Sequence, residues 1–233
     1  IKIILQLPQG GYGDFGILDH PAPGLNQWYA KWRLLDDDQR NPIRTFTASG
    51  IRPDAEELDI DFVVHEPGGP ASQWALQASV GQPMIVIGPD ARAEDSTGGI
   101  DFRPGDATRI LLAGDETAFP AMRNILAQQS ADTQVVAFVQ ADQPLDVDTL
   151  ATHGPNQQVY HVRPRGATAH EALSGAIDDW ARAVQPATGN FYAWLAGESS
   201  IVKQLRRLLV NQHQVPTTAI HFSGYWKRGR AEN

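Results

Sequence analysis

The sequence predicts a chain of two domains, an antiparallel β-barrel or sandwich followed by an α/β domain with a parallel sheet. In the first part, short strand-like segments are separated by turn-rich spacers with little helix, which is typical of antiparallel sheets. From Arg109 onward, apolar strands alternate with helical segments, and this alternation predicts a parallel sheet covered on both faces. The stretch 90–106, rich in Gly, Asp and Pro, is the expected linker. The domains are therefore expected to span residues 1–104 and 105–233.

The first domain is expected to contain short strands and little helix. Its strand-like segments are apolar or β-branched and are bounded by turn-forming residues. We expect strands over residues 1–7, 44–48, 58–65 and 84–88, and short helices over residues 28–32 and 73–79.

The turn Gly68-Gly69-Pro70 lies between an expected strand and an expected helix. Pro70 suits the first helical position, because its missing N–H would have no partner there. A glycine turn that opens a helix presents free backbone N–H groups and the positive end of the helix dipole, which favour a phosphate. A corner of this kind without a ligand is also common, so the turn alone leaves both interpretations open.

The second domain is expected to alternate strand and helix. In the segment 168–184, Leu173, Ile177, Trp180 and Val184 recur on one helical face. We expect strands over residues 109–114, 134–140, 157–162, 191–197 and 217–222, and helices over residues 117–129, 168–184 and 198–212.

Two of these strands end in a small residue followed by an acid. Gly114-Asp115 precedes Thr117, and Gly197-Glu198 precedes Ser199-Ser200. Ligands of parallel sheets bind outside the carboxyl ends of the strands, and small residues there let a flat ligand approach the backbone. The alternative is helix capping, with Asp115 or Thr117 on one helix and Ser199 or Ser200 on the next.

Composition excludes several classes of function. The chain has no Cys, so thiolate nucleophiles, iron–sulfur ligation and Cys-based zinc sites are absent. The formal net charge of −8 disfavours a nucleic-acid partner. The seven His show no metal-ligand spacing, and neither a G-x-S-x-G elbow nor a Walker lysine motif is present. No apolar run approaches the length of a membrane span.

Six segments in order resemble one known family. They are Arg44–Thr47 (RTFT), Glu57–Phe62 (ELDIDF) with His65, Gly69–Ser72 (GPAS) with Trp74, Ala113–Ala121 (AGDETAFPA), Tyr192–Glu198 (YAWLAGE) and Tyr225–Arg230 (YWKRGR). Across the whole chain, the sequence resembles the siderophore-interacting protein family, flavin-dependent ferric-siderophore reductases related to ferredoxin–NADP reductases. The resemblance implies a ferredoxin reductase-like fold, with an FAD-binding barrel followed by an NAD(P)H-binding domain.

The resemblance implies roles for individual residues. Arg44 resembles the arginine that meets the flavin pyrophosphate, and Thr47 resembles the hydroxyl near the reactive flavin nitrogen. The segment that faces flavin and nicotinamide resembles Asp115–Thr117, and Trp226 resembles the aromatic residue of the tail near the flavin. The implied cofactor-binding residues are Arg44, Thr45, Phe46, Thr47, His65, Gly69, Pro70, Ala71, Ser72, Trp74, Gly114, Asp115, Glu116, Thr117, Gly197 and Glu198.

The implied reaction is reduction of a ferric siderophore by NADH or NADPH through FAD, with release of Fe(II). Thr47, Asp115, Thr117 and Trp226 are the expected catalytic residues. Because the chelate is usually anionic, clustered cations late in the chain are the expected substrate-binding residues. These are Lys203, Arg206, Lys227, Arg228 and Arg230.

The chain departs from the family pattern at several positions. Phe46 stands where the family has Tyr, and Ser49 stands where an arginine is common. Gln140 ends a strand that often ends with an acid in relatives, which leaves the choice between NADH and NADPH open. The family also has strands before the segment that matches residues 1–8, so we expect the sequence to start late.

Two other functions are compatible with these residues. One is a general NAD(P)H-dependent reductase of free flavin or another acceptor. The other is a non-catalytic protein that binds a flavin or a siderophore. In each case we expect a cytoplasmic monomer without a nucleic-acid partner or stable membrane insertion.

Overall fold

A computed structural model describes residues 1–21, 24–64, 68–90, 92, 98–143, 150, 154–164, 169–187 and 189–229. Two of the expected site residues, His65 and Arg230, lie outside the described residues. In the part of the chain that is described, no helix combines the length and the hydropathy that crossing a membrane requires.

The chain folds into two compact units. Unit 1 consists of Ile1–Phe46 and Phe62–Gly99, and unit 2 consists of Thr47–Asp61 and Ile100–Arg230. The segment Arg44–Thr47, one of the six that resemble the family, is therefore divided between the units, with Phe46 in unit 1 and Thr47 in unit 2. The domain boundary expected after residue 104 stays a prediction.

Unit 1 is built on a three-stranded antiparallel sheet in the order β2-β1-β5. On the central strand, Ile3 lies opposite Arg44 on one side and Val86 on the other. Helix α1 packs on this sheet through Trp28 and Trp32, which are buried in one cluster with Ile4 and Phe15. The elements of unit 1 are β1 (Lys2–Ile4), α1 (Leu25–Leu34), β2 (Ile43–Thr45), α2 (Pro70–Gln77) and β5 (Ile85–Ile87).

The strand expected over residues 58–65 is wrong in most of its length. Strand β4 (Glu57–Asp59) ends at Asp59, and residues 60–64 have no regular structure. Two side-chain contacts with residues outside this segment explain this. Arg52 forms an ion pair of 2.5 Å with Asp59 and so fixes a hairpin of β4 with β3 (Gly50–Arg52), a strand that sequence reasoning missed. Past the hairpin, the Phe62 side chain stacks against other rings instead of joining a sheet.

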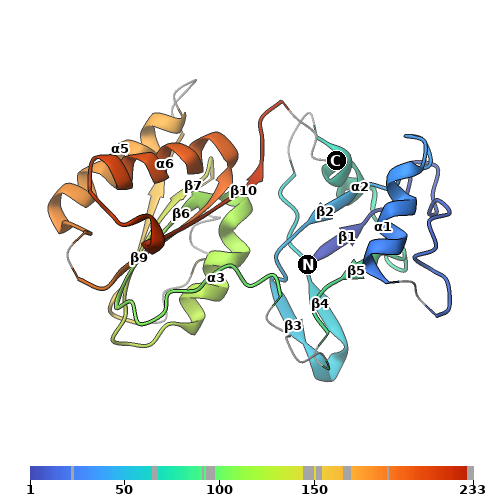
Figure 1. Cartoon of the computed structure of the whole chain (residues 1–233), viewed down its shortest axis with the longest axis horizontal. Helices are drawn as coiled ribbons and strands as arrows, with labels where there is room; N and C mark the ends of the chain where they lie inside the picture. Colours follow the sequence, from blue (N-terminus) through green and yellow to red (C-terminus); the bar gives the residue numbers. More distant parts are fainter. Residues whose placement is uncertain are drawn as a thin grey trace. The chain divides into compact units, whose positions relative to one another are not determined.

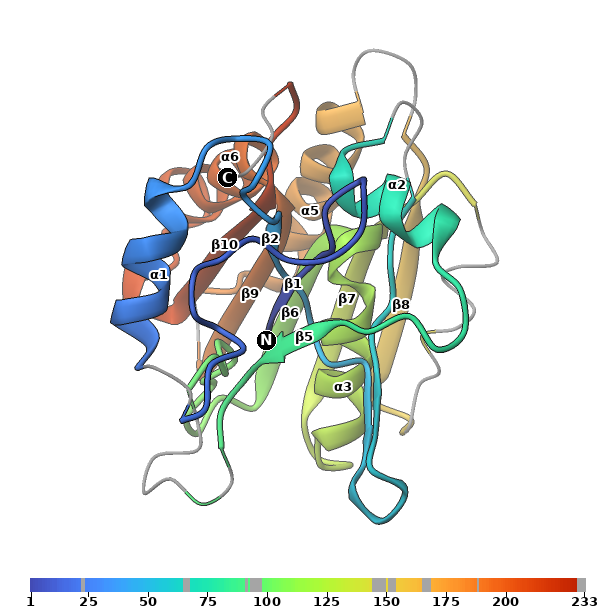
Figure 2. The same ribbon diagram turned by 90° about the vertical axis from the view of Figure 1, so that its right-hand side faces the viewer.

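Unit 2 contains a parallel sheet of five strands in the order β10-β9-β6-β7-β8 (Figure 2). Its central strands β6 and β9 are almost fully buried, as expected for strands that helices cover on both faces. The strands are β6 (Arg109–Asp115), β7 (Gln134–Gln140), β8 (Gln157–Val162), β9 (Phe191–Glu198) and β10 (Ile220–Trp226).

Alternate residues of the central strands supply two separate cores. Leu112 and Trp194 face helix α3 (Phe119–Gln128). Leu111 and Leu195 face the helices on the opposite side of the sheet. Those helices are α5 (Ala169–Val184) and α6 (Ser199–Asn211) (Figure 1). The predicted fold class, antiparallel strands followed by an α/β unit with a parallel sheet, is confirmed in this arrangement.

Candidate functional site

The carboxyl ends of the parallel strands bring several expected site residues to one edge of the unit 2 sheet. Asp115 at the end of β6 lies opposite Gln140 of β7, and Trp226 of β10 lies opposite Glu198 of β9. This is the edge at which ligands of parallel sheets bind. The edge therefore contains two acids and one aromatic residue from strands far apart in the sequence.

Asp115 is the hub of this edge. Its carboxylate is buried and accepts four hydrogen bonds. Oδ1 accepts from the backbone N–H of Thr117 at 3.0 Å and from the Thr117 hydroxyl at 2.5 Å. Oδ2 accepts from the backbone N–H of Glu198 at 2.7 Å and from Nε1 of Trp226 at 2.9 Å. One carboxylate thus ties the ends of β6, β9 and β10 together.

The small residues before the two acids are explained by this hub. A Cβ at Gly197 would lie 2.5 Å from Asp115 Oδ2, and Gly197 has φ +138°, which L side chains rarely adopt. A Cβ at Gly114 would lie 2.1 Å from the carbonyl oxygen of Ala196. Both glycines are therefore required for the close approach of β6 and β9, whether or not a ligand also approaches them.

Glu198 holds the start of α6 and the C-terminal tail. Its Oε2 accepts hydrogen bonds from the backbone N–H groups of Ser200 at 2.7 Å and Ile201 at 3.1 Å, and from the Ser200 hydroxyl. Its Oε1 accepts from the backbone N–H of Arg228 at 3.3 Å. Burial by itself raises the pKa of Glu198, but these hydrogen bonds outweigh burial and lower it.

The helix cap expected from Ser199 or Ser200 is therefore wrong, because Glu198 is the N-cap of α6 and both serines lie inside the helix. The longer Glu side chain reaches back to the N–H groups of the first turn, and its charge is favoured there by the helix dipole. Asp115 does act as a cap, but of the short 3₁₀ helix Glu116–Ala118 that precedes α3, where its side chain accepts from the N–H of Thr117. The cap expected from Thr117 is wrong, because α3 begins after Ala118 without a side-chain cap from the described residues.

Trp226 is held by one hydrogen bond of its side chain and one of its backbone. Its indole N–H donates to Asp115, and its carbonyl accepts from the Ser199 hydroxyl at 2.9 Å. The register of β10 against β9 shifts between Gly224 and Trp226. A shift of this kind re-aims neighbouring side chains. The expected catalytic residues Asp115, Thr117 and Trp226 are thus in direct contact with one another or share one carboxylate.

Thr47 belongs to unit 2, as does Tyr225, a residue that sequence reasoning did not place in the site. Burial raises the pKa of Tyr225 to about 12, the nearby Thr47 side chain acts against burial, and the charges of Asp101 and Asp115 raise the pKa further. The two-residue period of a strand puts Tyr225 on the same face of β10 as His221 and Ser223. A phenol that is buried there needs a hydrogen-bond partner.

Unit 1 contributes a second group of expected residues. The rings of Phe46, Phe62 and Trp74 form a row, with centroids 4.5 Å and 5.6 Å apart. The row connects the end of β2 to helix α2. In the same unit, Ser72 is buried and its hydroxyl donates to the carbonyl of Val63 at 3.5 Å. The expected residues around Phe46 and around Ser72 are therefore brought together.

The start of helix α2 fits a pyrophosphate. Pro70 occupies the first turn as expected, and among the described residues no side chain caps the helix. Within the same described part of the chain, no atom comes within 4 Å of the place where a Cβ of Gly69 would lie. The buried indole N–H of Trp74 has no hydrogen-bond acceptor among the residues that the structure describes. These are open donors and free space of the kind that an anionic cofactor fills.

Other polar residues in or next to the flavin motif form hydrogen bonds within the protein. Nη1 of Arg44 donates to the carbonyl of Ile43 at 2.8 Å. The Thr45 hydroxyl accepts from Nζ of Lys2 at 3.1 Å. Ser49, which replaces the expected arginine, is buried and donates to Oδ1 of Asp61 at 3.1 Å. Ser49 therefore serves the hairpin of β3 and β4.

The expected substrate-binding cations lie on two elements. Lys227 and Arg228 are exposed directly after Trp226, and Lys203 is exposed in the first half of α6. Arg206 lies further along α6, with its guanidinium 5.0 Å from the ring centroid of Phe222. Lys227 and Arg228 thus follow directly the residue whose indole donates to Asp115.

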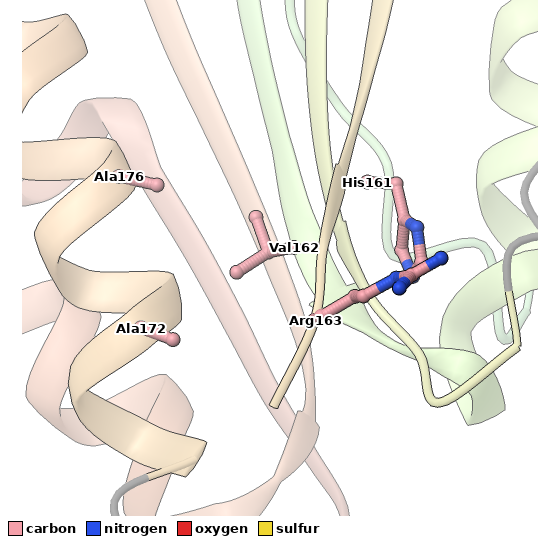
Figure 3. A pocket seen from close by; sticks show the side chains of 5 residues that line it. All are labelled: His161, Val162, Arg163, Ala172 and Ala176. Atoms are coloured by element: carbon pink, nitrogen blue, oxygen red, sulfur yellow. The ribbon is translucent and has the colours of Figure 1, made fainter. Parts of the chain in front are cut away.

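A hollow of about 380 Å³ lies at the end of β8, beside helix α5. Figure 3 shows His161 and Arg163 projecting to one side of β8 and Val162 projecting toward Ala172 and Ala176 of α5. His161 Nε2 lies 2.7 Å from the carbonyl oxygen of Ala141. On the neighbouring strand, Oε1 of Gln140 is buried and has no donor among the described residues.

Two family descriptions match the chain. Residues 1–93 match the siderophore-interacting FAD-binding domain, and residues 107–229 match the siderophore-interacting protein domain. The first match confirms the predicted cofactor FAD.

Two curated relatives have comparable identity. The ferric vibriobactin reductase ViuB of Vibrio cholerae is 32% identical over 196 residues, which cover 83% of this chain and 68% of ViuB. The mycobactin import ATP-binding/permease protein IrtA of Mycolicibacterium smegmatis is 33% identical over 191 residues, which cover 81% of this chain and 20% of IrtA. The chain therefore spans only a small part of IrtA.

Solved structures agree on the fold. The siderophore-interacting protein SipS of Aeromonas hydrophila has a TM-score of 0.65 at 22% identity, covering 97% of this chain and 83% of SipS. The ferredoxin reductase of carbazole 1,9a-dioxygenase has a TM-score of 0.56 at 19% identity, covering 79% of this chain and 55% of that one. The predicted ferredoxin reductase-like fold is confirmed, and the chain belongs to the siderophore-interacting protein family.

Proposed function

We propose that the chain is an oxidoreductase that uses FAD and a pyridine nucleotide to reduce the iron of a ferric siderophore. Family membership and fold support a siderophore-related flavin reductase. The observation that supports the finer proposal most strongly is the Asp115 carboxylate, which holds Trp226 and the backbone of Glu198 at the ligand-binding edge of the sheet.

FAD supplies chemistry that no side chain of this protein offers. When bound, it takes two electrons as a hydride from the nicotinamide and returns them one at a time. Ferric siderophores hold Fe(III) through hard oxygen donors, which suit Fe(II) poorly, so a one-electron reduction releases the iron. The residues of the protein bind and orient the reactants.

We assign the binding of the pyrophosphate to unit 1. The unblocked start of α2 at Gly69 and the guanidinium of Arg44 offer donors to its oxygens. The indole N–H of Trp74 offers one further donor. Phe46, in the place of the family's Tyr, offers a ring for packing but no phenol hydrogen bond.

We assign the orientation of the reacting rings to unit 2. The Asp115 carboxylate keeps the Trp226 indole in one position, and Thr117 shares that carboxylate. Thr47 contributes a hydroxyl from the same unit. No proton has to leave any of these side chains for them to act, because each works by fixing a donor or a ring.

Lys227 and Arg228 are the proposed docking cations for the anionic chelate. Both are exposed, and both follow the fixed residue Trp226 directly. Lys203 and Arg206 on α6 extend the positive surface, although Arg206 also stacks on Phe222. That the protein acts as a cytoplasmic monomer stays a prediction.

The experiment is an iron-release assay on the full chain with added FAD. Iron(III) complexes of citrate, 2,3-dihydroxybenzoate and acetohydroxamate are mixed with NADH or NADPH, and Fe(II) is trapped by a coloured chelator. We expect Fe(II) to form only when protein, FAD and nucleotide are all present. Formation of Fe(II) at the rate of free FAD alone, for every chelate, would contradict the proposal. Rapid reduction of free FAD with no iron release would instead favour a general flavin reductase.

A further inference from the structure

Thr47 lies at a point where the chain passes from one unit to the other. Phe46 belongs to unit 1, whereas the segment Thr47–Asp61 belongs to unit 2. On the unit 2 side, Nδ2 of Asn124 on helix α3 donates to the carbonyl oxygen of Ala48 at 2.9 Å. The residue that directly follows Thr47 is therefore bound to a helix that lies far away in the sequence.

The peptide group between Ala48 and Ser49 is hydrogen-bonded on both sides. Its carbonyl oxygen accepts from Asn124, and its N–H donates to the carbonyl oxygen of Asp59 at 2.9 Å. The first bond ties the peptide group to α3, and the second ties it to the hairpin of β3 and β4. Because a peptide group is planar, two bonds on opposite sides fix the orientation of its plane. The backbone next to Thr47 is thus held in one orientation.

A second contact joins the other end of the segment to the same helix. Arg123 forms an ion pair of 3.0 Å with Asp61, and the two side chains are 36% and 50% exposed. Ion pairs that are exposed to this degree contribute little to stability. Asn124 therefore provides the stronger of the two links between the segment and α3.

Helix α3 is a firm support for this hydrogen bond. Ile125 and Leu126, which follow Asn124, are buried in the core between α3 and the sheet. The helix begins directly after the 3₁₀ turn that Asp115 caps. The bond from Asn124 therefore fixes the backbone beside Thr47 to the element that leaves the Asp115 hub.

We propose that Asn124 is a positioning residue for the flavin reaction, because its side-chain amide holds the backbone from which Thr47 presents its hydroxyl. This inference rests on the proposed function, in which Thr47 helps to orient the reacting rings. Asn124 lies outside the six segments that resemble the family.

The isosteric change Asn124→Asp removes this hold without changing the size of the side chain. An amide carries an NH₂ donor, whereas an ionised carboxylate only accepts hydrogen bonds. The introduced carboxylate would face the Ala48 carbonyl oxygen, another acceptor. The matched control is Asn156→Asp, because Nδ2 of Asn156 also donates to an alanine carbonyl of unit 2, that of Ala131 at 2.7 Å.

The first measurement needs no cofactor. In the full chain without FAD, hydrogen exchange of the Ser49 backbone amide, followed by NMR, reports how often the doubly bonded peptide group opens. Asn124→Asp should make this exchange about fivefold faster, the effect of one lost hydrogen bond, and Asn156→Asp should leave it unchanged. Exchange within twofold of wild type in Asn124→Asp overturns the proposal.

The second measurement follows the reduction of bound FAD by NADH or NADPH in a single anaerobic turnover. At saturating nucleotide, Asn124→Asp should lower the rate constant about fivefold. The nucleotide concentration for half-saturation should stay the same, because Asn124 acts on Thr47 and does not bind the nucleotide. Asn156→Asp should change neither value, and a rate constant for Asn124→Asp within twofold of wild type overturns the proposal.

A double substitution shows whether Asn124 acts through Thr47. In the Thr47→Val background, Asn124→Asp should have no further effect on the rate constant, whereas a merely structural role would give the same loss in both backgrounds. Equal losses in the two backgrounds overturn the proposal, and so does a wild-type rate constant for Thr47→Val alone. If Asn124→Asp does not fold, Asn124→Ala removes the donor without adding a charge, and the same criteria apply to it.

The outcomes separate this inference from the proposed function. If the wild-type chain binds no FAD, both fail together. If the wild-type chain binds FAD and releases iron but the rate constant for flavin reduction does not depend on Asn124, the inference alone fails.

Discussion

Replacing Asp115 by asparagine tests the hub of the candidate site directly. The carboxylate accepts two hydrogen bonds on each oxygen, from Thr117 on one and from Glu198 and Trp226 on the other. An amide has one accepting oxygen and one NH₂ donor. Whichever way the introduced amide turns, one pair of N–H or O–H donors meets an NH₂ group instead of an acceptor.

The size of the effect follows from the bonds lost. Hydrogen bonds to a charged acceptor each contribute about 1.5–3 kcal/mol, and a buried donor without a partner costs about 1–3 kcal/mol. If the NH₂ group faces Glu198 and Trp226, two bonds are lost, and unfolding of unit 2 should become easier by at least about 3 kcal/mol. Urea denaturation measures this, and the control Asp178→Asn removes a carboxylate that pairs with exposed Arg182 and with His213 away from the hub.

A double-mutant cycle isolates the bond between Asp115 and Trp226. Trp226→Phe keeps a ring but removes the indole N–H, so in that background Asp115→Asn should lose less stability. We expect a coupling of about 1.5–3 kcal/mol between the two positions. The indole Nε1–H signal of Trp226 should also exchange faster with solvent in Asp115→Asn, as NMR can measure. A coupling near zero, with an unchanged indole signal, would refute the reasoning.

Three further predictions concern other parts of the site. The double variant Lys227→Ala/Arg228→Ala should raise the KM for a ferric chelate about fivefold and leave FAD content unchanged. The control Lys31→Ala on α1 should change neither the KM nor the FAD content. Steady-state assays at low salt measure this, and a KM of the double variant equal to that of wild type would remove both residues from the docking surface. Arg163→Ala should raise the KM for NADPH more than the KM for NADH. The guanidinium of Arg163 lines the hollow beside β8 and suits a 2′-phosphate, and the neutral Gln140 does not repel one. Equal changes of the two KM values would argue against binding of the 2′-phosphate in this hollow. Glu198→Gln should reduce the loss of stability at acid pH. The pKa of the Glu198 carboxyl lies below its ordinary value of 4.5, so its charge stabilises the fold above pH 4.5, and this stabilisation is lost as the pH falls through the lowered pKa. Urea midpoints measured from about pH 3 to about pH 7 test this, and a pH dependence equal to that of wild type would contradict it.

The sequence determines the α/β unit well because its signals are local and strong. The strands of RILLAG and FYAWLAG type are continuous apolar runs, and only a strand covered on both faces can bury such a run. Pro70 at the start of α2 follows from the missing N–H of proline in the same way. Elements specified by residues within one turn or one strand could therefore be predicted with nearly correct bounds.

Elements that depend on distant partners could not be predicted in this way. Phe62, Val63 and Val64 have the composition of a strand, yet residues 60–64 are irregular. Their segment follows a hairpin that the Arg52–Asp59 ion pair closes, and the Phe62 ring stacks on two others. Propensity is a weak guide when side-chain packing and long-range pairing decide the backbone.

The candidate site, too, could be predicted from the sequence only in part. The pattern at the strand ends indicated Asp115 and Thr117, and the family resemblance added Trp226; the parallel topology places Asp115 and Trp226 at one edge. The sequence did not show that Gly197 makes room for the Asp115 carboxylate, because that contact joins strands separated by many residues. The cap of α6 is local, but a glutamate is a less common N-cap than the serines that follow it, so the sequence favoured the serines.

The central claim is that this chain holds FAD where a pyridine nucleotide can reduce it and a ferric chelate can reoxidise it. The most direct measurement is an anaerobic absorbance titration of the FAD-loaded chain, first with NADH or NADPH and then with iron(III) 2,3-dihydroxybenzoate. The absorbance of oxidised flavin at about 450 nm is a property of the cofactor. We predict that this absorbance is lost when the nucleotide is added and returns when the chelate is added. A chain that takes up no FAD, or whose bound flavin keeps its colour in excess nucleotide, would contradict the account.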